Sequence, residues 1–480
     1  MRWRFHTLKS RLLHLKALLS ILLLLSVCLS GLAQNPRITG RMAPVRAERV
    51  IVVSIDGLDA RYLSRRDELG LKIPTLRRLM ANGATASGVV SVYPSVTYPA
   101  HTTLVTGALP ARHGIFGNEE FLPGNTAEMT ELQWFARAIK IDTLWDAAAR
   151  RKLKTAMVSW PVSVGAGDYS FPEILKLNGS LEETLALIKA NDRPDGLVDD
   201  LEKRDPQLYS NLNKDEGDDM RTRFAEYILT TKRPDVVLVH LFDLDHFQHE
   251  FGPFTPKAVE MLEKSDGYLA RILAAAERSG SMDDTAIFVV SDHGFMPITR
   301  RVHPGVLLAE AGLIKLRQDK GADGKVRTVI TSWRAIPYVT SGACSIFLHD
   351  PKDMDALRKA RAVFKLLEGK SESGIFRVVD AKEIRKLGGN PRAAFMVDAA
   401  EGFSFGRNFS GPSITDTSQR GQHGYLPIRP DYKASFIMTG SIITRRGDIG
   451  EVRMIDIGPT IARVRNLWLR DAEGRALSIK

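Results

Sequence analysis

The sequence predicts an α/β fold with a central, mostly parallel sheet, and two observations lead to this prediction. Three short runs rich in Val, Ile and Leu are nearly continuous in apolar residues: 49–57, 235–247 and 285–294. Runs of this kind are typical of strands buried on both faces. Segments with helical spacing of apolar residues, such as 74–83 and 257–280, lie between them. This alternation favours a parallel sheet covered by helices.

The first 33 residues predict an export signal, before any element of the core. Residues 1–16 are basic and contain no acid, residues 17–29 are almost entirely apolar, and Gly31 and Ala33 offer small residues before Gln34. This pattern is typical of a secretory signal and is short for a membrane span. An uncleaved anchor and a lipoprotein acylated at Cys28 remain as alternatives. We expect a bacterial periplasmic or secreted protein without a membrane span after cleavage.

Composition indicates a globular enzyme and not a nucleic-acid-binding protein. The chain is 44% hydrophobic and 26% charged, and loss of residues 1–33 lowers the formal net charge from +11 to +6. Because the excess of basic over acidic residues is so small, no stable nucleic-acid partner is expected. Cys344 is the one cysteine after residue 33. Without an intrachain disulfide, stability must come from the core or from bound metal.

Each of the three predicted strands ends in acidic residues. Asp56 closes the first, Asp245 follows the second, and Asp292 with His293 closes the third. In parallel sheets, ligands bind beyond the carboxyl ends of the strands. We therefore expect these side chains to lie together at one edge.

Two further histidines complete a candidate metal-ligand set. His249 lies four residues after Asp245, so both face one side if that segment is helical. His423 lies in a glycine-rich loop. Mixed imidazole and carboxylate ligands suit Zn²⁺, and six ligands suit two ions better than one. Two such ions form a clamp for displacement at phosphorus.

The stretch YPSVTYPAHTTLVTG, residues 93–107, offers hydroxyl groups before an apolar run. Ser or Thr followed by Pro99 is also what an ordinary helix N-terminus looks like. The stretch alone therefore does not decide whether Ser95 or Thr97 is a nucleophile or merely a capping residue.

Short motifs along the chain resemble the alkaline phosphatase superfamily, and most closely its nucleotide pyrophosphatase/phosphodiesterase (type I phosphodiesterase) branch. In order, they are VSIDG at Asp56, YPSVTYPAHTTLVTG at Thr97, PARHGIFGN at Asn118, SWP at Trp160, DLDHFQHEFGP at Asp245 and His249, SDHGF at Asp292 and His293, GQHGY at His423, and the tail MIDIGPTIARV. They span residues 49–467, nearly the whole mature chain. The resemblance implies an alkaline-phosphatase-like three-layer sandwich with inserted cap segments.

The resemblance also implies roles for these residues. Thr97 would be the nucleophile, and Ser95 a hydroxyl that only caps the helix. Asn118 would donate to a phosphate oxygen. His101 and His113 match no metal position and would be structural or would support the metal ligands. One zinc ion would be held by Asp56, Asp292, His293 and Thr97, and a second by Asp245, His249 and His423.

The reaction implied is hydrolysis of a small-molecule phosphodiester or a nucleotide pyrophosphate through a phospho-threonine intermediate. Tyr98 and Trp160 match positions where the family places aromatic residues near the substrate, although both fit a core role equally well. Ala100 and Leu177 depart from the family pattern and weaken a nucleobase preference.

The same residues bear on other functional classes. No Lys-x-Arg pair that would grip a monoester lies near Trp160, yet a phosphomonoesterase or a phosphonate hydrolase would share every metal ligand. Residues 97–101 lack the Cys or Ser and the Arg of a sulfatase. A non-catalytic exported binding protein would predict a broken ligand set, and all six ligands are present.

The 480-residue chain is expected to consist of the signal, residues 1–33, and a phosphodiesterase domain, residues 34–480. The core would span about 48–160, 230–300 and 420–470. Insertions would occupy about 161–229, with helices, and about 300–420, with mixed strands and helices.

Overall fold

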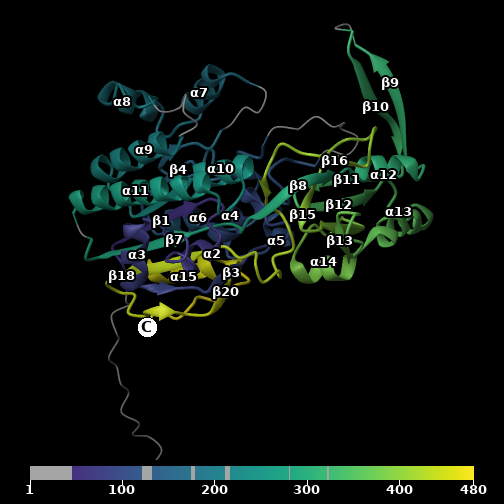
Figure 1. Cartoon of the computed structure of the whole chain (residues 1–480). Helices are drawn as coiled ribbons and strands as arrows, with labels where there is room; N and C mark the ends of the chain where they lie inside the picture. The colour runs from purple at the N-terminus through teal and green to yellow at the C-terminus, as the bar shows by residue number, and fades with distance from the viewer. Residues whose placement is uncertain (1–45, 122–131, 175–178, 211–216, 281, 322–323) are drawn as a thin grey trace, which may run out of the picture. The chain divides into compact units, whose positions relative to one another are not determined.

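The structure is a computed structural model that describes residues 46–121, 132–174, 179–210, 217–280, 282–321 and 324–480 (Figure 1). The expected signal segment and Leu177 lie outside these residues. Within them, no helix combines the length and the apolar character needed to cross a membrane.

An eight-stranded, largely parallel sheet forms the centre of the fold (Figure 1). Its strands, in spatial order, are β19 (Gly447–Asp448), β2 (Ala84–Thr85), β18 (Phe436–Gly440), β7 (Thr285–Val290), β1 (Arg49–Ile55), β6 (Val236–Leu241), β4 (Thr155–Val158) and β5 (Tyr169–Phe171). The run from β7 to β5 is parallel, and β18 is antiparallel to both of its neighbours, β7 and β2. The predicted fold class is confirmed.

Strand register brings the three predicted acidic strand ends to one edge. Ile55, the last residue of β1, pairs with Leu241, the last residue of β6, and Ser54 pairs with Val290, the last residue of β7. The residues that follow these strands therefore begin side by side, although they are about 50 to 240 positions apart in the chain.

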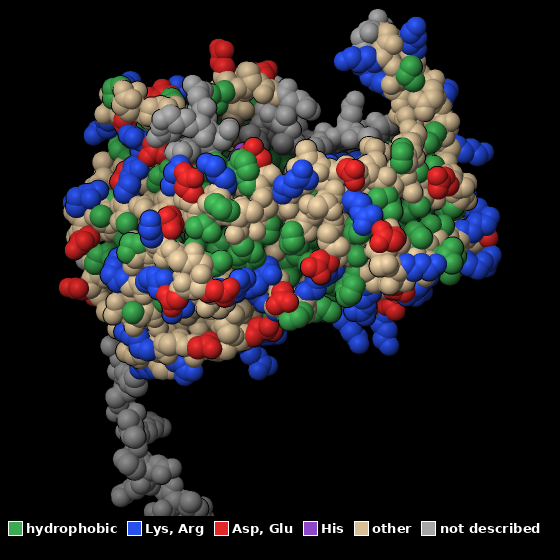
Figure 2. Space-filling model, viewed as in Figure 1, with side chains coloured by type: hydrophobic (Ala, Val, Ile, Leu, Met, Phe, Trp, Pro, Cys, Tyr) green, Lys and Arg blue, Asp and Glu red, His purple; other side chains and the backbone are tan. Residues whose placement is uncertain are grey.

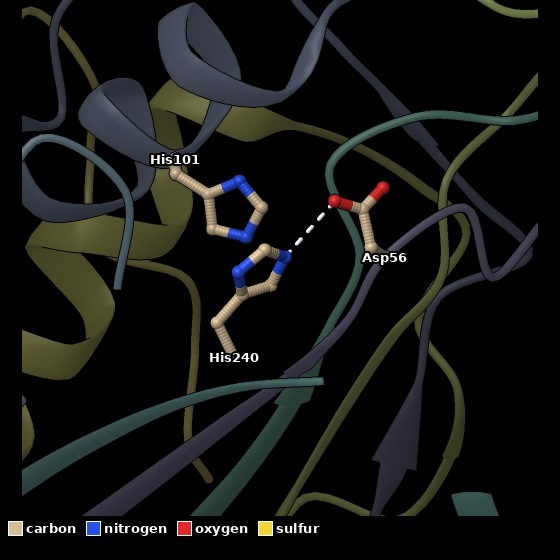
Figure 3. Close-up of side chains that lie close together, drawn as sticks. All are labelled: Asp56, His101 and His240. Carbon is tan, nitrogen blue, oxygen red and sulfur yellow. Dashed lines mark hydrogen bonds and ion pairs between the residues drawn. The ribbon is translucent and has the colours of Figure 1, made fainter. Parts of the chain in front are cut away.

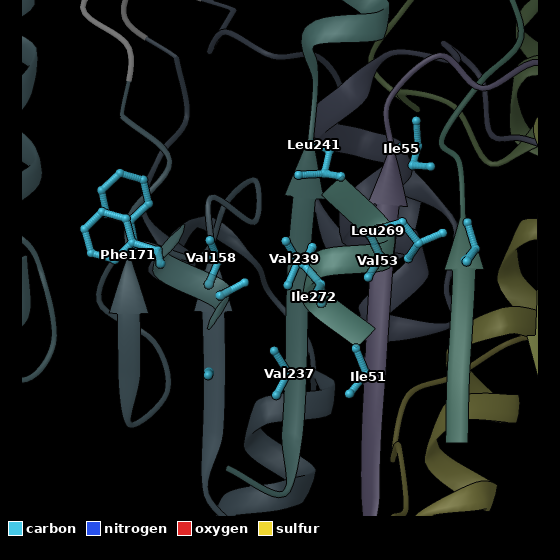
Figure 4. Packing of buried hydrophobic residues seen from close by; sticks show 14 of the residues in the cluster. Ile51, Val53, Ile55, Val158, Phe171, Val237, Val239, Leu241, Leu269 and Ile272 are labelled. Atoms are coloured by element: carbon cyan, nitrogen blue, oxygen red, sulfur yellow. The ribbon is translucent and has the colours of Figure 1, made fainter. Parts of the chain in front are cut away.

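The central strands are buried on both faces, as the continuous apolar runs predict. Figure 4 shows Ile51 and Val53 of β1 beside Val237 and Val239 of β6, with Leu269 of α11 (Pro256–Arg278) packed over them. The alternate residues of β1, such as Val50 and Val52, are also buried. Each large aliphatic side chain buried in this way contributes about 1.5–3 kcal/mol.

Helices cover the sheet on both sides. Helix α11 contacts α3 (Pro74–Ala81), α9 (Gly217–Thr231) and α10 (Asp243–Phe251), and these helices share the core seen in Figure 4. In a second set, α15 (Ile457–Val464) contacts both α4 (Thr97–Thr106) and α6 (Leu144–Arg150). Shorter elements are α2 (Ala60–Ser64), α5 (Pro110–His113), the 3₁₀ turns η1 (Ala136–Ala138) and η3 (Met454–Asp456), and the strand pair β3 (Gly88–Val90) and β20 (Glu451–Arg453).

The expected insertions contain their own elements. Helices α7 (Leu181–Ala190) and α8 (Leu197–Arg204) fall within 161–229. From residue 296 onward a second apolar core surrounds a four-stranded antiparallel sheet. That sheet consists of β11 (Ala335–Thr340), β12 (Ala343–Leu348), β14 (Phe395–Ala399) and β13 (Ile375–Asp380), and the neighbouring helices are α12 (Pro304–Glu310), α13 (Met354–Leu367) and α14 (Ala381–Leu387).

Smaller strands complete this part of the chain. The strand β8 (Met296–Val302) pairs with β15 (Gly402–Phe405), β16 (Ile414–Asp416) and β17 (Gly421–Gln422), and β9 (Ile314–Lys320) pairs with β10 (Val326–Trp333). Because β17 contacts α10 and precedes His423, this connection places His423 near the edge of the central sheet. On the face shown in Figure 2, basic and acidic side chains alternate without a continuous patch of either sign.

Candidate active site

The serine and threonine hydroxyl groups of residues 91–106 differ sharply in their surroundings. Five of them are buried and hydrogen-bonded within the protein: Ser91, Ser95, Thr102, Thr103 and Thr106. Thr97 is partly exposed, and its Oγ1 makes no hydrogen bond with any described residue. Among these hydroxyls, that of Thr97 is therefore the one available to a substrate.

Ser95 does not cap the helix, so that alternative is wrong. The residue preceding α4 is Val96, and no side chain caps this helix. Ser95 Oγ instead donates to the Tyr425 carbonyl at 2.6 Å and lies 2.8 Å from the Tyr432 hydroxyl. Thr97 is the first residue of α4. Backbone N–H groups and the positive end of the helix dipole meet at such a position, which favours a bound anion.

Asp56, Asp292 and His293 form the first cluster of candidate ligands. Their ligand atoms lie within 4.8 Å of one another. His293 Nε2 lies 3.3 Å from Asp56 Oδ1 and 3.0 Å from Asp292 Oδ2. The N–H of Gly57, whose φ is +67°, donates to Asp292 Oδ1 at 3.1 Å. A Cβ at Gly57 would lie 2.9 Å from Gln248 Nε2, so the turn needs glycine.

Asp245, His249 and His423 form the second cluster, also within 4.8 Å of one another. Asp245 and His249 lie one turn apart on α10, as predicted, with 3.3 Å between Oδ2 and Nε2. His423 Nε2 lies 3.7 Å from Asp245 Oδ1. The glycine-rich loop thus brings His423 to residues about 175 positions earlier in the chain.

The two clusters are neighbours. His293 Nε2 lies 3.9 Å from Asp245 Oδ1. The rings of His293 and His423 stack at 3.7 Å between centroids, with 7° between their planes. The six predicted ligands are therefore brought together as one centre with two lobes.

The three histidines share a hydrogen-bonding pattern that suits metal ligation. Nδ1–H of His249 donates to the Gly421 carbonyl at 3.0 Å, that of His423 to the Ser95 carbonyl at 3.3 Å, and that of His293 to the Gly294 carbonyl at 3.2 Å. Each Nε2 therefore keeps a lone pair directed at the carboxylates. Backbone carbonyls commonly orient metal-binding histidines in this way.

Buried atoms that lack a hydrogen-bond partner indicate whether the site could hold a metal ion. Asp56 Oδ1, Asp245 Oδ1, Asp292 Oδ2 and His293 Nε2 are buried and have no hydrogen-bond partner among the described residues. Leaving such atoms unpaired costs about 1–3 kcal/mol each, and more if they are charged. All four belong to the predicted ligand set, and the three carboxylate oxygens lie 3.0 to 3.9 Å from His293 Nε2. The residues fit divalent cations with mixed nitrogen and oxygen ligands.

The pKa values of the buried carboxyl groups are shifted because several ionisable groups lie close together. Burial, with Asp292 and Asp245 close by, raises the pKa of Asp56 well above its usual range. Burial alone would raise the pKa of Asp292 too, but His293 and His101 lower it overall. A bound cation would favour the ionised form of all these carboxyls.

The start of α4 contacts residues of the site through backbone carbonyls. His101 Nδ1–H donates to the Thr97 carbonyl at 2.8 Å, and the same nitrogen is 3.7 Å from Asp292 Oδ2. On the other side, the Ser95 carbonyl accepts from His423. The start of α4 is thus attached to both lobes of the centre.

Asn118 lies beside the nucleophile candidate. Its Oδ1 accepts from the Tyr98 N–H at 2.9 Å, which leaves the amide N–H groups as donors. The side chain is partly exposed. This orientation suits a donor to a phosphate oxygen at the start of α4.

Tyr98 and Trp160 are almost entirely buried, with exposed fractions of 2% and 0%. Trp160 packs edge-on against His101, with 5.0 Å between ring centroids. Neither ring offers an exposed face for stacking in this structure. His113 is a buried structural residue, as predicted, since it pairs with Thr103 Oγ1 at 3.0 Å.

His240 is a member of the site that the sequence analysis missed. Its Nε2 lies 2.9 Å from Asp56 Oδ2, and with His101 these residues form the cluster in Figure 3. Burial, and then His101, lowers the pKa of His240. The one sequence feature that could have indicated this role is that His240 is the single polar residue within the apolar run VVLVHL.

Comparison with protein families gives a match over most of the chain. The family model described as type I phosphodiesterase / nucleotide pyrophosphatase matches residues 50–426. Human ectonucleotide pyrophosphatase/phosphodiesterase family member 1 is 25% identical over 255 residues, covering 51% of this chain and 23% of that protein. Venom phosphodiesterase of Macrovipera lebetinus is 24% identical over 282 residues, covering 57% of this chain and 27% of that protein. The match thus spans about a quarter of these relatives' length.

Solved structures show the same fold. Human ectonucleotide pyrophosphatase/phosphodiesterase 5 superposes with a TM-score of 0.60 at 17% identity, covering 89% of this chain and 97% of that one. An inactive threonine-to-alanine variant of the murine protein, in complex with AMP, gives 0.61 at 19% identity with the same coverage.

Proposed function

The chain belongs to the type I phosphodiesterase / nucleotide pyrophosphatase family, and from this we propose that it is a metal-dependent hydrolase of phosphodiester or pyrophosphate bonds in small nucleotide-like substrates. One observation carries the proposal. Thr97, with a partly exposed side chain, begins helix α4, and backbone carbonyls at the start of this helix accept from His101 and from the candidate ligand His423. The AMP complex of the murine structural relative supports a nucleotide as the substrate class.

Two zinc ions are the proposed cofactors. Asp56, Asp292, His293 and Thr97 would hold one of them, and Asp245, His249 and His423 the other. Bound zinc would supply a lowered pKa for a coordinated hydroxyl and positive charge against the phosphate oxygens.

Thr97 is the proposed nucleophile in a double displacement. Its Oγ1 gives up its proton and forms a bond to phosphorus while the bond from phosphorus to the leaving oxygen breaks, and the leaving alcohol or phosphate takes up a proton. Water then attacks the phospho-threonine ester, the Oγ1–P bond breaks, and a proton restores the hydroxyl. The N-terminal N–H groups of α4 and the Asn118 amide face the charge that develops on the non-bridging oxygens. Tyr98 and Trp160 are proposed as the walls behind this phosphoryl site.

Export is also proposed, on the pattern of residues 1–33. The names of the relatives, an ectonucleotide enzyme and a venom enzyme, are in keeping with this. The proposed destination is the bacterial periplasm or the medium.

A substrate comparison tests the proposed function. We expect the zinc-loaded protein to hydrolyse the para-nitrophenyl ester of thymidine monophosphate with a higher kcat/KM than para-nitrophenyl phosphate. The leaving group is the same in both. The sequence around Trp160 contains no Lys-x-Arg pair that could meet the extra charged oxygen of the monoester. Charged hydrogen bonds of this kind are worth about 1.5–3 kcal/mol, about 10- to 100-fold. A large monoester preference would assign the site to a phosphomonoesterase instead.

Replacement of Asn118 tests the oxyanion role. Asn118→Ala removes the amide donor, and we expect kcat to fall by about 100- to 1,000-fold. Asn118→Asp is the matched variant, because its carboxylate still accepts from the Tyr98 N–H but donates nothing and adds a negative charge. It should be at least as impaired. If Asn118→Ala kept kcat within about 3-fold of wild type, Asn118 would have no part in stabilising the transition state.

A further inference from the structure

His240 occupies an unusual place for a histidine. It lies in β6, between β1 and β4 in the middle of the parallel sheet, next to Ser54 of β1. Only 2% of its surface is exposed. All other residues of this strand are apolar. A polar ring in such a position needs partners for both nitrogens.

Both ring nitrogens of His240 have partners, and one is a candidate metal ligand. Nδ1 lies 3.0 Å from the Ser159 carbonyl, and Nε2 lies 2.9 Å from Asp56 Oδ2. Figure 3 shows the other carboxylate oxygen, Oδ1, pointing away from the imidazole. Oδ1 is the unpartnered atom that lies 3.3 Å from His293 Nε2. The two oxygens of Asp56 thus face different partners.

The backbone on the far side of the ring is held in an uncommon conformation. Ser159 has φ of +51°, in the left-handed region that non-glycine residues rarely adopt. This conformation is strained for a residue with a side chain, and such residues often occur at functional sites. Ser159 closes β4, and its carbonyl accepts from His240. The hydrogen bond from His240 to the Ser159 carbonyl is therefore made by a residue with a strained backbone.

A third metal ion does not explain the cluster of Asp56, His101 and His240. His101 accepts from Ser54 Oγ at Nε2, 2.8 Å away, and its Nδ1–H donates to the Thr97 carbonyl. Since both nitrogens of His240 are also hydrogen-bonded, none of the four ring nitrogens has a free lone pair. The cluster is a hydrogen-bonded support behind the metal ligands.

We propose that His240 is a positioning residue for metal binding: it holds Asp56 Oδ2, so that Oδ1 faces the first cation site. The proposal rests on the proposed metal dependence of the site. A carboxylate has a broad torsional preference about its last bond, so a single hydrogen bond can select its orientation. Loss of such a partner of a metal ligand typically weakens metal binding about 10- to 100-fold.

The test measures zinc binding by His240→Phe and His240→Gln, through competition with a chromophoric chelator. Phenylalanine keeps an aromatic ring without a donor, whereas the glutamine amide can still donate to Asp56. We expect one of the two zinc sites to weaken about 10- to 100-fold in His240→Phe and by less in His240→Gln. The control is His303→Phe. His303 is buried and hydrogen-bonded to Thr415 Oγ1 at 2.9 Å, but contacts no candidate ligand. It should bind both ions as wild type does.

Thermal unfolding of the metal-free variants separates positioning from a purely structural role. A structural residue would lower the melting temperature of the metal-free protein and leave zinc affinity unchanged, and that result would overturn the proposal. Zinc binding by His240→Phe at both wild-type affinities would also overturn it. If His240→Phe does not unfold cooperatively, His240→Met replaces it, and the same comparison with His240→Gln decides. Turnover is measured separately, so an inactive wild type that shows the expected zinc pattern would contradict only the proposed function.

Discussion

Replacing Thr97 by alanine is expected to lower kcat by about 10⁴-fold or more while both zinc ions stay bound, since removing a nucleophile costs about 10⁴- to 10⁶-fold in comparable enzymes. The physical reason is the availability of this hydroxyl. Among the serine and threonine residues of 91–106 it is the partly exposed one, and the other serine and threonine hydroxyls there are buried and already hydrogen-bonded. The measurement is steady-state turnover of the nucleotide diester, together with zinc content for each variant.

Two variants on the same helix serve as controls for Thr97→Ala. Thr102→Ala removes the same atoms from α4, where the hydroxyl only donates to the Tyr98 carbonyl at 2.8 Å, so activity should stay near wild type. Thr97→Ser retains a hydroxyl and should recover a measurable part of the rate. A Thr97→Ala protein that turns over at nearly the wild-type rate would rule out the phospho-threonine pathway.

Removing the metal ions is the second change with a large expected effect. Dialysis against a strong chelator should lower turnover by at least about 1,000-fold, because a threonine hydroxyl is a poor nucleophile unless a metal or a base activates it. Added zinc should restore the rate. The melting temperature should fall with the metal as well, since a ligand at 100 times its Kd stabilises the folded state by about 2.7 kcal/mol per site. Activity assays and calorimetry of the same samples check both effects.

A ligand variant gives this prediction a control within the chain. Asp245→Asn changes a ligand of the second cluster and leaves Asp56, Asp292 and His293 in place. We expect Asp245→Asn to lower the zinc affinity of one site selectively. A preparation that is fully active and contains no divalent cation would contradict the proposed metal dependence.

The family and the general fold were readable from short, local features. The apolar runs that became β1, β6 and β7 are continuous because both faces of a central parallel strand are covered. Their acidic ends are readable because a parallel sheet presents every strand's carboxyl end at one edge. The ordered motifs then identified the family, which the match over residues 50–426 shows. For Asp245 and His249, helical spacing alone was enough to place them together.

Other features depended on residues far apart in the chain. His240 was missed because nothing in VVLVHL indicates that its ring meets Asp56, which lies 184 positions away. The hydroxyl of Ser95 could not be assigned to Tyr425 and Tyr432, more than 300 positions later, from the pattern around it. The burial of Tyr98 and Trp160 likewise follows from packing, since an aromatic residue fits a core and a binding surface equally well.

By itself, the sequence determined the family, the α/β class and the six residues of the candidate metal centre, because strand periodicity and motif order are properties of short segments. Only the tertiary structure decided which hydroxyl is available, which oxygen of Asp56 remains free, and that His423 reaches Asp245. Those outcomes depend on hydrogen bonds and burial between segments that only the folded chain brings into contact, and no local pattern encodes such distances.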